Sequence, residues 1–302
     1  MAIKTLILGN SGTGKSASLR NFDPEEIAVI NCAGKPLPFQ NDFEQHTPSF
    51  KTLTEDVMKL LDQIKKKVIV IDDAQYIMSF QYMRRIHENG WDKWNDIQSD
   101  FFKIIQICDH IDNNVTVYFL SHLTKDEDGT EKIKTMGKML DEKIIIEGLF
   151  TTVLKTSVQD GRYYFITQNS GKDTVKSPMG MFDTFAIDND LKFVDERIRN
   201  YYKIGEYVSD EKIAAMAEEV NAPEIEKPEP KKRGRKARNE IKKEAEQSEV
   251  AEEKSEAAEP AEPAEPEVIG NTVVEPAEQV EPEKKPKRRR RKTREPETDE
   301  TV

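Results

Sequence analysis

The sequence is poor in cysteine and contains no long apolar run. Only Cys32 and Cys108 occur among 302 residues, and they show no paired spacing. This argues against a disulfide framework or a zinc site and is typical of a reducing compartment. No apolar stretch approaches the roughly 20 residues that a membrane helix requires, and the N-terminus lacks the pattern of a signal peptide. We therefore expect a cytoplasmic protein with no membrane association.

Aromatic residues are absent from the C-terminal part of the chain. All 13 Phe, 8 Tyr and 2 Trp lie at or before Tyr207, whereas most of the 15 prolines come after Ser209. The later segment also contains the repeat EPAEPAEPE at 259–267. Such a composition cannot bury enough apolar surface to offset the entropy lost on ordering. The sequence thus predicts one folded domain over 1–208 and a disordered tail over 209–302.

Positive charge in the predicted tail is concentrated in two blocks, although the whole chain has a net charge of −11. The blocks are KKRGRKAR at 231–238 and KKPKRRRRKTR at 284–294, and neither contains an acidic residue. Clusters of this kind bind polyanions with a strong dependence on salt. The sequence does not indicate what the two blocks bind.

The folded part has the pattern of an α/β protein. Apolar or β-branched runs at 3–8, 27–32, 68–72 and 115–121 predict buried parallel strands, and amphipathic stretches at 53–64 and 92–111 predict helices. Two alternating runs within 150–167 are joined by Asp160-Gly161, which is typical of a β-hairpin. We expect a mainly parallel sheet with helices on both faces and a C-terminal antiparallel hairpin.

A P-loop pattern follows the first predicted strand. Its residues are Gly9, Asn10, Ser11, Gly12, Thr13, Gly14, Lys15 and Ser16. The glycines allow backbone N–H groups to face phosphate oxygens, and a helix is expected from about Lys15. Lys15 is expected to reach the β- and γ-phosphates, and Ser16 to bind Mg²⁺. The pattern therefore predicts that ATP and Mg²⁺ are the cofactors.

Two carboxylates end the predicted strand at 68–72. Asp72 and Asp73 would lie at the same sheet edge as the P-loop. We expect Asp72 to contribute to the Mg²⁺ site and Asp73 to orient or deprotonate the attacking water. The alternative is that the pair only caps a following helix.

The strand at 115–121 is followed by another candidate at the same edge. Either Ser121 or His122 could hydrogen-bond the γ-phosphate or the water and transmit its loss to the next loop. A histidine in this position can also be structural. We name His122 as the candidate catalytic residue.

The ordered set of motifs resembles a known group. The P-loop, VIVIDD at 68–73, VYFLSH at 117–122, the late hairpin and VKSPMGMF at 175–182 are similar to phage-encoded RecA-like ATPases of the Sak-type single-strand annealing group, often described as AAA-domain nucleotide-binding proteins. The resemblance implies a RecA-like core, DNA-stimulated ATP hydrolysis on single-stranded DNA, and a role in phage recombination or replication beside a single-strand-binding protein. It also implies a homo-oligomer in the host cytoplasm.

The resemblance gives a meaning to lysines that follow the hairpin. Lys172 and Lys176 lie where RecA-like ATPases place DNA loops and cations that reach a neighbouring subunit's phosphate.

Two alternative functions remain. A nucleotide-dependent loader acting on a partner such as a helicase is disfavoured because no helical lid is expected after the hairpin. A small-molecule kinase is disfavoured because neither an acceptor pocket nor an arginine-rich lid is evident.

Overall fold

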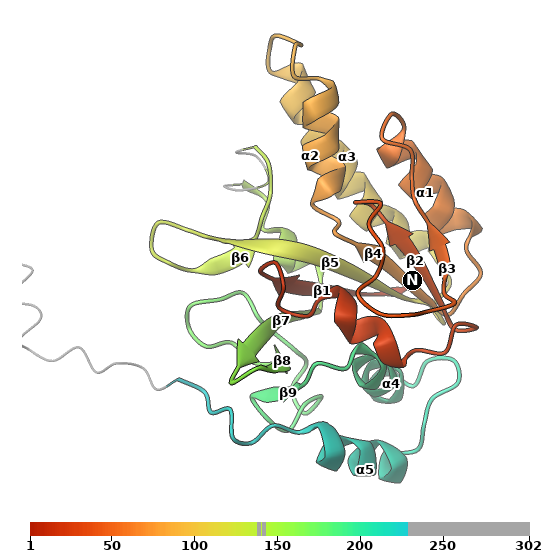
Figure 1. Cartoon of the computed structure of the whole chain (residues 1–302), viewed down its shortest axis with the longest axis vertical. Helices are drawn as coiled ribbons and strands as arrows, with labels where there is room; N and C mark the ends of the chain where they lie inside the picture. Colours follow the sequence, from red (N-terminus) through yellow and green to blue (C-terminus); the bar gives the residue numbers. More distant parts are fainter. Residues whose placement is uncertain (138–139, 141–142, 229–302) are drawn as a thin grey trace, which may run out of the picture. The chain divides into compact units, whose positions relative to one another are not determined.

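The computed structural model describes residues 1–137, 140 and 143–228, all within one compact unit, Met1–Lys231. Strands and helices alternate along most of this part of the chain (Figure 1). The strands are β1 (Ile3–Gly9), β2 (Ile27–Asn31), β3 (Glu44–His46), β4 (Val68–Asp72), β5 (Thr116–Lys125), β6 (Glu131–Ile133), β7 (Thr152–Gln159), β8 (Arg162–Ile166) and β9 (Ala186–Asp188).

Among the described residues, five α-helices and three short 3₁₀ helices lie between the strands or follow the last one. They are α1 (Leu53–Gln63), α2 (Tyr76–Arg84), α3 (Asp92–Ile107), α4 (Leu191–Tyr202), α5 (Asp210–Val220), η1 (Ser16–Asn21), η2 (Cys108–His110) and η4 (Ile146–Leu149). Within the part of the chain that the structure describes, none is long and apolar enough to cross a bilayer.

The strands form one mainly parallel sheet in the order β3-β2-β4-β5-β1-β7-β8-β9, with β6 paired to β5 outside this sequence. All residues of β2 and β4 are buried, as expected for strands covered on both faces. Strand β5 lies between β1 and β4 and is parallel to both. Because these strands are parallel, the carboxyl ends of β1, β4 and β5 lie at the same edge of the sheet.

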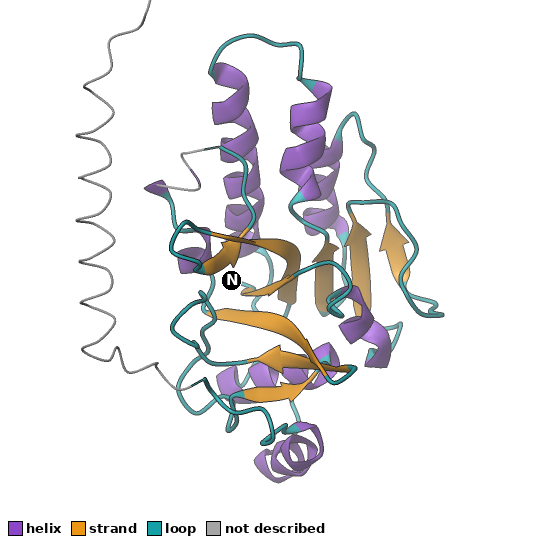
Figure 2. Ribbon diagram, turned by 60° about the vertical axis from the view of Figure 1, so that its left-hand side comes forward, coloured by secondary structure: helices purple, strands orange, loops and turns teal. Residues whose placement is uncertain are grey.

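Helices cover both faces of the sheet. On one face, α1, α2 and α3 pack over a cluster that includes Leu61, Met78 and Phe101. On the other, α4 and α5 pack over a second cluster that includes Ile198 and Ile213. Figures 1 and 2 show the two groups of helices on opposite sides of the strands. The expected α/β architecture, a mainly parallel sheet with helices on both faces, is therefore confirmed.

The C-terminal hairpin is also confirmed. Strands β7 and β8 pair antiparallel from Gln159 and Arg162 onward. Between them, Asp160 has φ 50° and Gly161 has φ 77°. Two successive residues with positive φ match the twist that a two-residue hairpin requires.

Some elements differ from the expected ones. The helix after the P-loop is only the six-residue 3₁₀ segment η1, because the chain turns at Phe22 and soon meets Pro24. Strand β5 continues to Lys125, past the expected end at residue 121, because its last residues pair with β6. The short strands β3, β6 and β9 had no alternating pattern long enough to predict them.

The expected boundary at residue 208 is wrong, because α5 lies beyond it. Ser209 caps this helix by accepting a hydrogen bond from the backbone N–H of Lys212. Ile213 is buried against the core, and the backbone N–H of Ala222 bonds the carbonyl of Ala186 in β9. The apolar face of α5 is buried there, which compensates for ordering the segment. The remaining tail, including both basic blocks, lies outside the described residues.

A buried ion pair fixes α4 to the edge of the sheet at which β4 and β5 begin. Nε of Arg199 lies 2.7 Å from the carboxylate of Asp195, and both side chains are almost fully buried. Asp195 also accepts hydrogen bonds from Thr116 and Tyr118 of β5, while Arg199 donates to the carbonyl oxygen of Lys67. Both charges therefore have several partners, which buried charges require.

We expect α5 to stabilise the domain. A chain ending at residue 208 should lose at least about 2 kcal/mol of unfolding free energy relative to one ending at residue 228, since it exposes the surface that Ile213 covers. Urea denaturation followed by circular dichroism measures this difference. The chain ending at 228 should match the full chain, and equal stabilities for all three would contradict the assignment of α5 to the folded unit.

Candidate nucleotide-binding and hydrolysis site

The P-loop leaves β1 at Gly9 and turns on two glycines with positive φ. These are Gly12, at φ 77°, and Gly14, at φ 95°. A Cβ at Gly14 would lie 3.0 Å from the Tyr163 ring and 3.1 Å from Oδ1 of Asn189, so a side chain would be both strained and crowded. The loop therefore has the open backbone that a phosphate cradle needs.

Lys15 lies folded over this loop. Its Nζ donates hydrogen bonds to the carbonyl oxygens of Gly9, at 3.0 Å, and Asn10, at 2.9 Å. Burial lowers the pKa of Lys15, and the charges of Asp73 and Asp72 oppose that shift. The two backbone carbonyl oxygens carry only partial negative charge. The Lys15 ammonium group can therefore exchange them readily for phosphate oxygens.

Ser16 and Asp72 are in contact although 56 positions separate them. The Ser16 hydroxyl donates to the Asp72 carboxylate, with Oγ 2.9 Å from Oδ1 and 3.0 Å from Oδ2. Burial raises the pKa of Asp72 to about 6, and the neighbouring charge of Asp73 adds to this shift. The hydroxyl and carboxylate are the two protein oxygens that a Mg²⁺–nucleotide site of this type uses. The donor set therefore fits the expected metal position.

Asp73 occupies an unusual backbone position immediately after β4. Its φ is 56°, in the left-handed region, and the hydrogen bond from the backbone N–H of Ala74 to the carbonyl of Leu120, at 2.8 Å, holds the turn in place. Strain of this kind is found at functional sites, where the surrounding structure maintains it.

The Asp73 carboxylate faces the cavity above the P-loop. This cavity has a volume of about 350 Å³ and is lined by Lys15, Ser16, Asp73 and His122, among others. Asp73 forms an ion pair with Lys35, and its Oδ1 lies 3.6 Å from Nε2 of His122. An acid and an imidazole thus lie together beside the P-loop.

His122 faces the cavity from β5, whereas Ser121 is fully buried. The register pairs His122 with Gly9, so its side chain is level with the start of the P-loop. Burial lowers the pKa of His122, and the positive charge of Lys15 lowers it further. Of the two alternatives at this position, only His122 is placed to contact a nucleotide.

Lys35, Gln75 and Tyr163 complete the site and were not predicted. Lys35 belongs to the loop after β2 and pairs with Asp73, Gln75 accepts a hydrogen bond from the backbone N–H of His122 at 3.1 Å, and Tyr163 borders the cavity from β8. The position of Lys35 shortly after a parallel strand was a signal that could have identified it, because that strand ends at the same edge.

Lys176 is not among the residues that line this cavity. Its backbone pairs with Val153 through hydrogen bonds of 2.8 and 2.9 Å, and Val153 is level with Leu6 in the middle of β1. Lys172 is placed near Gly129 in the β5–β6 turn. A role for Lys176 across a subunit interface stays a prediction.

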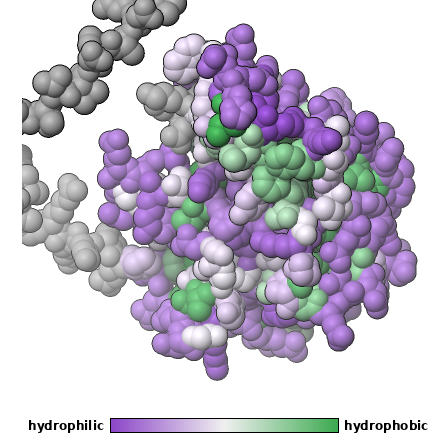
Figure 3. All heavy atoms as spheres, turned by 45° about the horizontal axis from the view of Figure 1, so that its top comes forward, coloured by the Kyte–Doolittle hydropathy of each residue, from purple (hydrophilic) through white to green (hydrophobic). Residues whose placement is uncertain are grey.

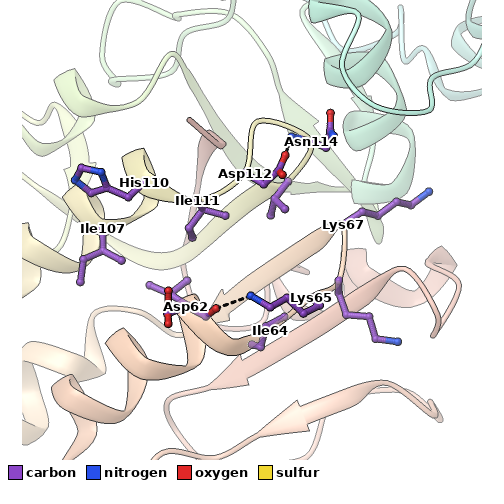
Figure 4. Close-up of a pocket in the computed structure, with 12 residues that line it drawn as sticks. Asp62, Ile64, Lys65, Lys67, Ile107, His110, Ile111, Asp112 and Asn114 are labelled. Carbon is purple, nitrogen blue, oxygen red and sulfur yellow. Dashed lines mark hydrogen bonds between the residues drawn. The ribbon is translucent and has the colours of Figure 1, made fainter.

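A separate cavity of about 400 Å³ lies at the opposite edge of the sheet (Figure 4). Its lining residues, including Lys65, Ile111 and Asn114, precede β4 and β5, whereas the P-loop follows β1. The cavity therefore cannot share a ligand with the P-loop.

Within the described ranges, no group of three or more His, Cys, Asp or Glu side chains could hold a metal ion.

Comparisons with known proteins agree with a nucleotide site. A family model described as an AAA domain matches residues 1–178. The comparison with curated proteins gave no match. Among solved structures, a KaiC-like protein from the hyperthermophilic archaeon Pyrococcus horikoshii OT3 is similar at 16% identity over 54% of this chain and 77% of that chain, with a TM-score of 0.36. That similarity is too low to support a functional argument.

The electrostatics of Asp72 lead to a test of stability. Because burial raises its pKa from 3.8 to about 6, ionisation of Asp72 destabilises the fold as pH rises through this range. Asp72→Asn should therefore raise the unfolding free energy at pH 7.5 by up to about 3 kcal/mol, with little change near pH 3.5. Urea titrations without nucleotide or magnesium measure both values. A variant less stable than the wild type at pH 7.5 would contradict this electrostatic assignment.

Proposed function

This chain belongs to the AAA domain family of P-loop NTPases, and on that premise we propose that it binds ATP with Mg²⁺ and hydrolyses it. The observation that carries the proposal is the contact between Ser16 and Asp72 beside a cavity that Asp73 and His122 also border. There, residues from β4 and β5 meet the P-loop that follows β1, which positions the groups that phosphoryl transfer uses.

Each residue has a distinct role in this proposal. The backbone of residues 9–14 holds the phosphates, and Lys15 exchanges its carbonyl partners for phosphate oxygens. Ser16 and Asp72 hold the metal, which when bound neutralises charge on the phosphates.

Three further residues act on the attacking water in this proposal. Asp73 orients the water or accepts its proton, and His122 hydrogen-bonds the water or the γ-phosphate. Lys35 holds the Asp73 carboxylate in position.

We further propose that hydrolysis is coupled to single-stranded DNA in phage recombination or replication, beside a single-strand-binding protein. The support is the resemblance to the Sak-type ATPases and the two basic blocks at 231–238 and 284–294. In this proposal the protein is a homo-oligomer in which Lys176 reaches a neighbouring subunit's nucleotide. Coupling would run through the β5–β6 hairpin, which continues directly from His122.

A nucleotide-dependent switch that acts on a protein partner is the second candidate. Two helices, α4 and α5, follow the hairpin, but both pack on the core and neither is the helical lid whose expected absence disfavours this candidate. The last turn of α2 and its connection to α3 expose large apolar side chains, with Met83 55% and Trp91 78% exposed. On the one face that it draws, Figure 3 separately shows a group of hydrophobic side chains within a mostly hydrophilic surface. Exposed apolar patches are typical of protein interfaces.

Two substitutions test the hydrolytic role of the site. Lys15→Ala should reduce ATP turnover by at least about a hundredfold, because it removes a cation from the phosphates. Asp73→Asn should lower turnover by a similar factor while ATP binding is retained, because the P-loop is intact. Steady-state phosphate release and nucleotide titration measure both effects. Lys59→Ala, at an exposed lysine of α1, is the matched control, and full turnover by Asp73→Asn would exclude that residue from the mechanism.

Coupling to DNA is tested with a chain that ends at residue 228. Single-stranded DNA should stimulate ATP turnover by this chain as strongly as by the full chain at saturating DNA, because the loops beside His122 are retained. DNA affinity should become less dependent on salt, by roughly 0.7 log units of slope for each phosphate that the removed tail neutralised. The absence of stimulation in the full chain, together with nucleotide-dependent binding of a protein, would favour the switch instead.

A further inference from the structure

A second cavity lies beside the P-loop, on the side away from Asp73 and His122. Its volume is about 680 Å³, and its lining residues are Ala17, Arg20, Arg162, Tyr163, Asp188 and Asn189. Ala17 and Tyr163 also line the cavity above the P-loop. The two cavities therefore adjoin, and a ligand whose phosphates occupy the P-loop can extend from one into the other.

Asn189 has an unusual environment in this second cavity. The residue is only 2% exposed, yet neither its Nδ2 nor its Oδ1 has a hydrogen-bond partner. Among the described residues, no other buried amide side chain leaves both polar atoms unpartnered. Burying an amide without partners is unfavourable by far more than a typical hydrogen bond gains. A ligand in this cavity could supply the donor and the acceptor that the Asn189 amide lacks.

The backbone of Asn189 is fixed on both sides. Its N–H donates to the carbonyl of Tyr163 at 3.1 Å, and its carbonyl accepts from Arg20 at 2.6 Å. These contacts join β8, the end of β9 and η1. A rigid backbone with unused side-chain hydrogen bonds is the arrangement of a preorganised binding residue.

Tyr163 adds an aromatic surface at the boundary between the two cavities. It is 47% exposed, although it lies in a strand whose following residues are buried. Exposed aromatic rings next to phosphate-binding groups provide stacking surfaces for nucleic-acid bases. The carboxylate of Asp188 and the guanidinium group of Arg162 border the same space and can meet polar groups of a sugar or base.

We propose that this second cavity holds the nucleoside half of the bound nucleotide. The base stacks on Tyr163, and the Asn189 amide donates one hydrogen bond to the nucleoside and accepts another. The assignment rests on the proposed function, because it requires the triphosphate to occupy the P-loop. It goes beyond that function by identifying the residues that distinguish a nucleotide from any other polyphosphate.

Binding of ATP and of inorganic tripolyphosphate to the full chain separates these two contributions. With Mg²⁺ present, Asn189→Leu should weaken ATP binding by at least about tenfold while tripolyphosphate binding is unchanged. Tyr163→Ala should give the same pattern, because loss of base stacking also costs about tenfold. Tyr207→Ala is the matched control, since Tyr207 is 46% exposed and belongs to neither cavity. Isothermal titration calorimetry measures each dissociation constant.

The outcomes separate this inference from the proposed function. If the wild type binds neither ligand, the proposed function itself fails. If the wild type binds both but Asn189→Leu weakens them equally, Asn189 only supports the P-loop and the nucleoside assignment is overturned. If Asn189→Leu does not fold, unchanged ATP binding by Tyr163→Ala overturns the assignment.

Two further ligands identify the group that the Asn189 amide contacts. If it contacts the sugar, wild type should bind 2′-deoxy-ATP about tenfold more weakly than ATP, and Asn189→Leu should remove that difference. If it contacts the base edge, wild type should instead discriminate ATP from GTP, and the variant should lose that discrimination. Both patterns support a nucleoside subsite, whereas a wild type that discriminates against neither ligand contradicts a direct contact from the amide.

Discussion

The parallel pairing of β1, β5 and β4 is the constraint on which the candidate site depends. It places Gly9 level with His122 and brings Asp72 to the same edge, where the carboxylate meets the Ser16 hydroxyl. The P-loop, Asp72 and His122 are far apart in sequence. Because a shift of one residue would turn each strand's side chains to the opposite face, the register of the buried strands fixes the chemistry as well as the core.

The site buries several ionisable groups close together, which lowers the stability of the fold. Asp72 and Asp73 are adjacent and buried; burial raises the pKa of Asp72, and the neighbouring charge of Asp73 raises it further. Lys15 and Lys35 offset part of this cost. At the other end of the sheet, Arg199 and Asp195 form a buried pair with complete partners. The two charge clusters thus differ: the Arg199–Asp195 pair has all its partners within the protein, whereas the groups beside the P-loop can still bind a ligand.

The helices after the hairpin connect the second core cluster to the P-loop. Asp190, which caps α4, accepts a hydrogen bond from Asn21 of η1, and the preceding Asn189 accepts one from Arg20 through its carbonyl. The segment that ends the folded unit thus also shapes the side of the P-loop away from Asp73. A ligand that contacts Asn189 would therefore be linked to the stability of α4.

The sequence by itself determined the P-loop, the strand ending in Asp72 and the Asp160-Gly161 hairpin, because each depends on local backbone geometry or continuous burial. It also contained the spacing of Ile213, Met216 and Val220 that forms α5, but the polar, proline-rich composition around it obscured that signal. Only the tertiary structure decided that Lys35 meets Asp73 and that Tyr163 and Asn189 flank the P-loop. These contacts join separate loops, and their geometry follows from long-range packing rather than from any local pattern.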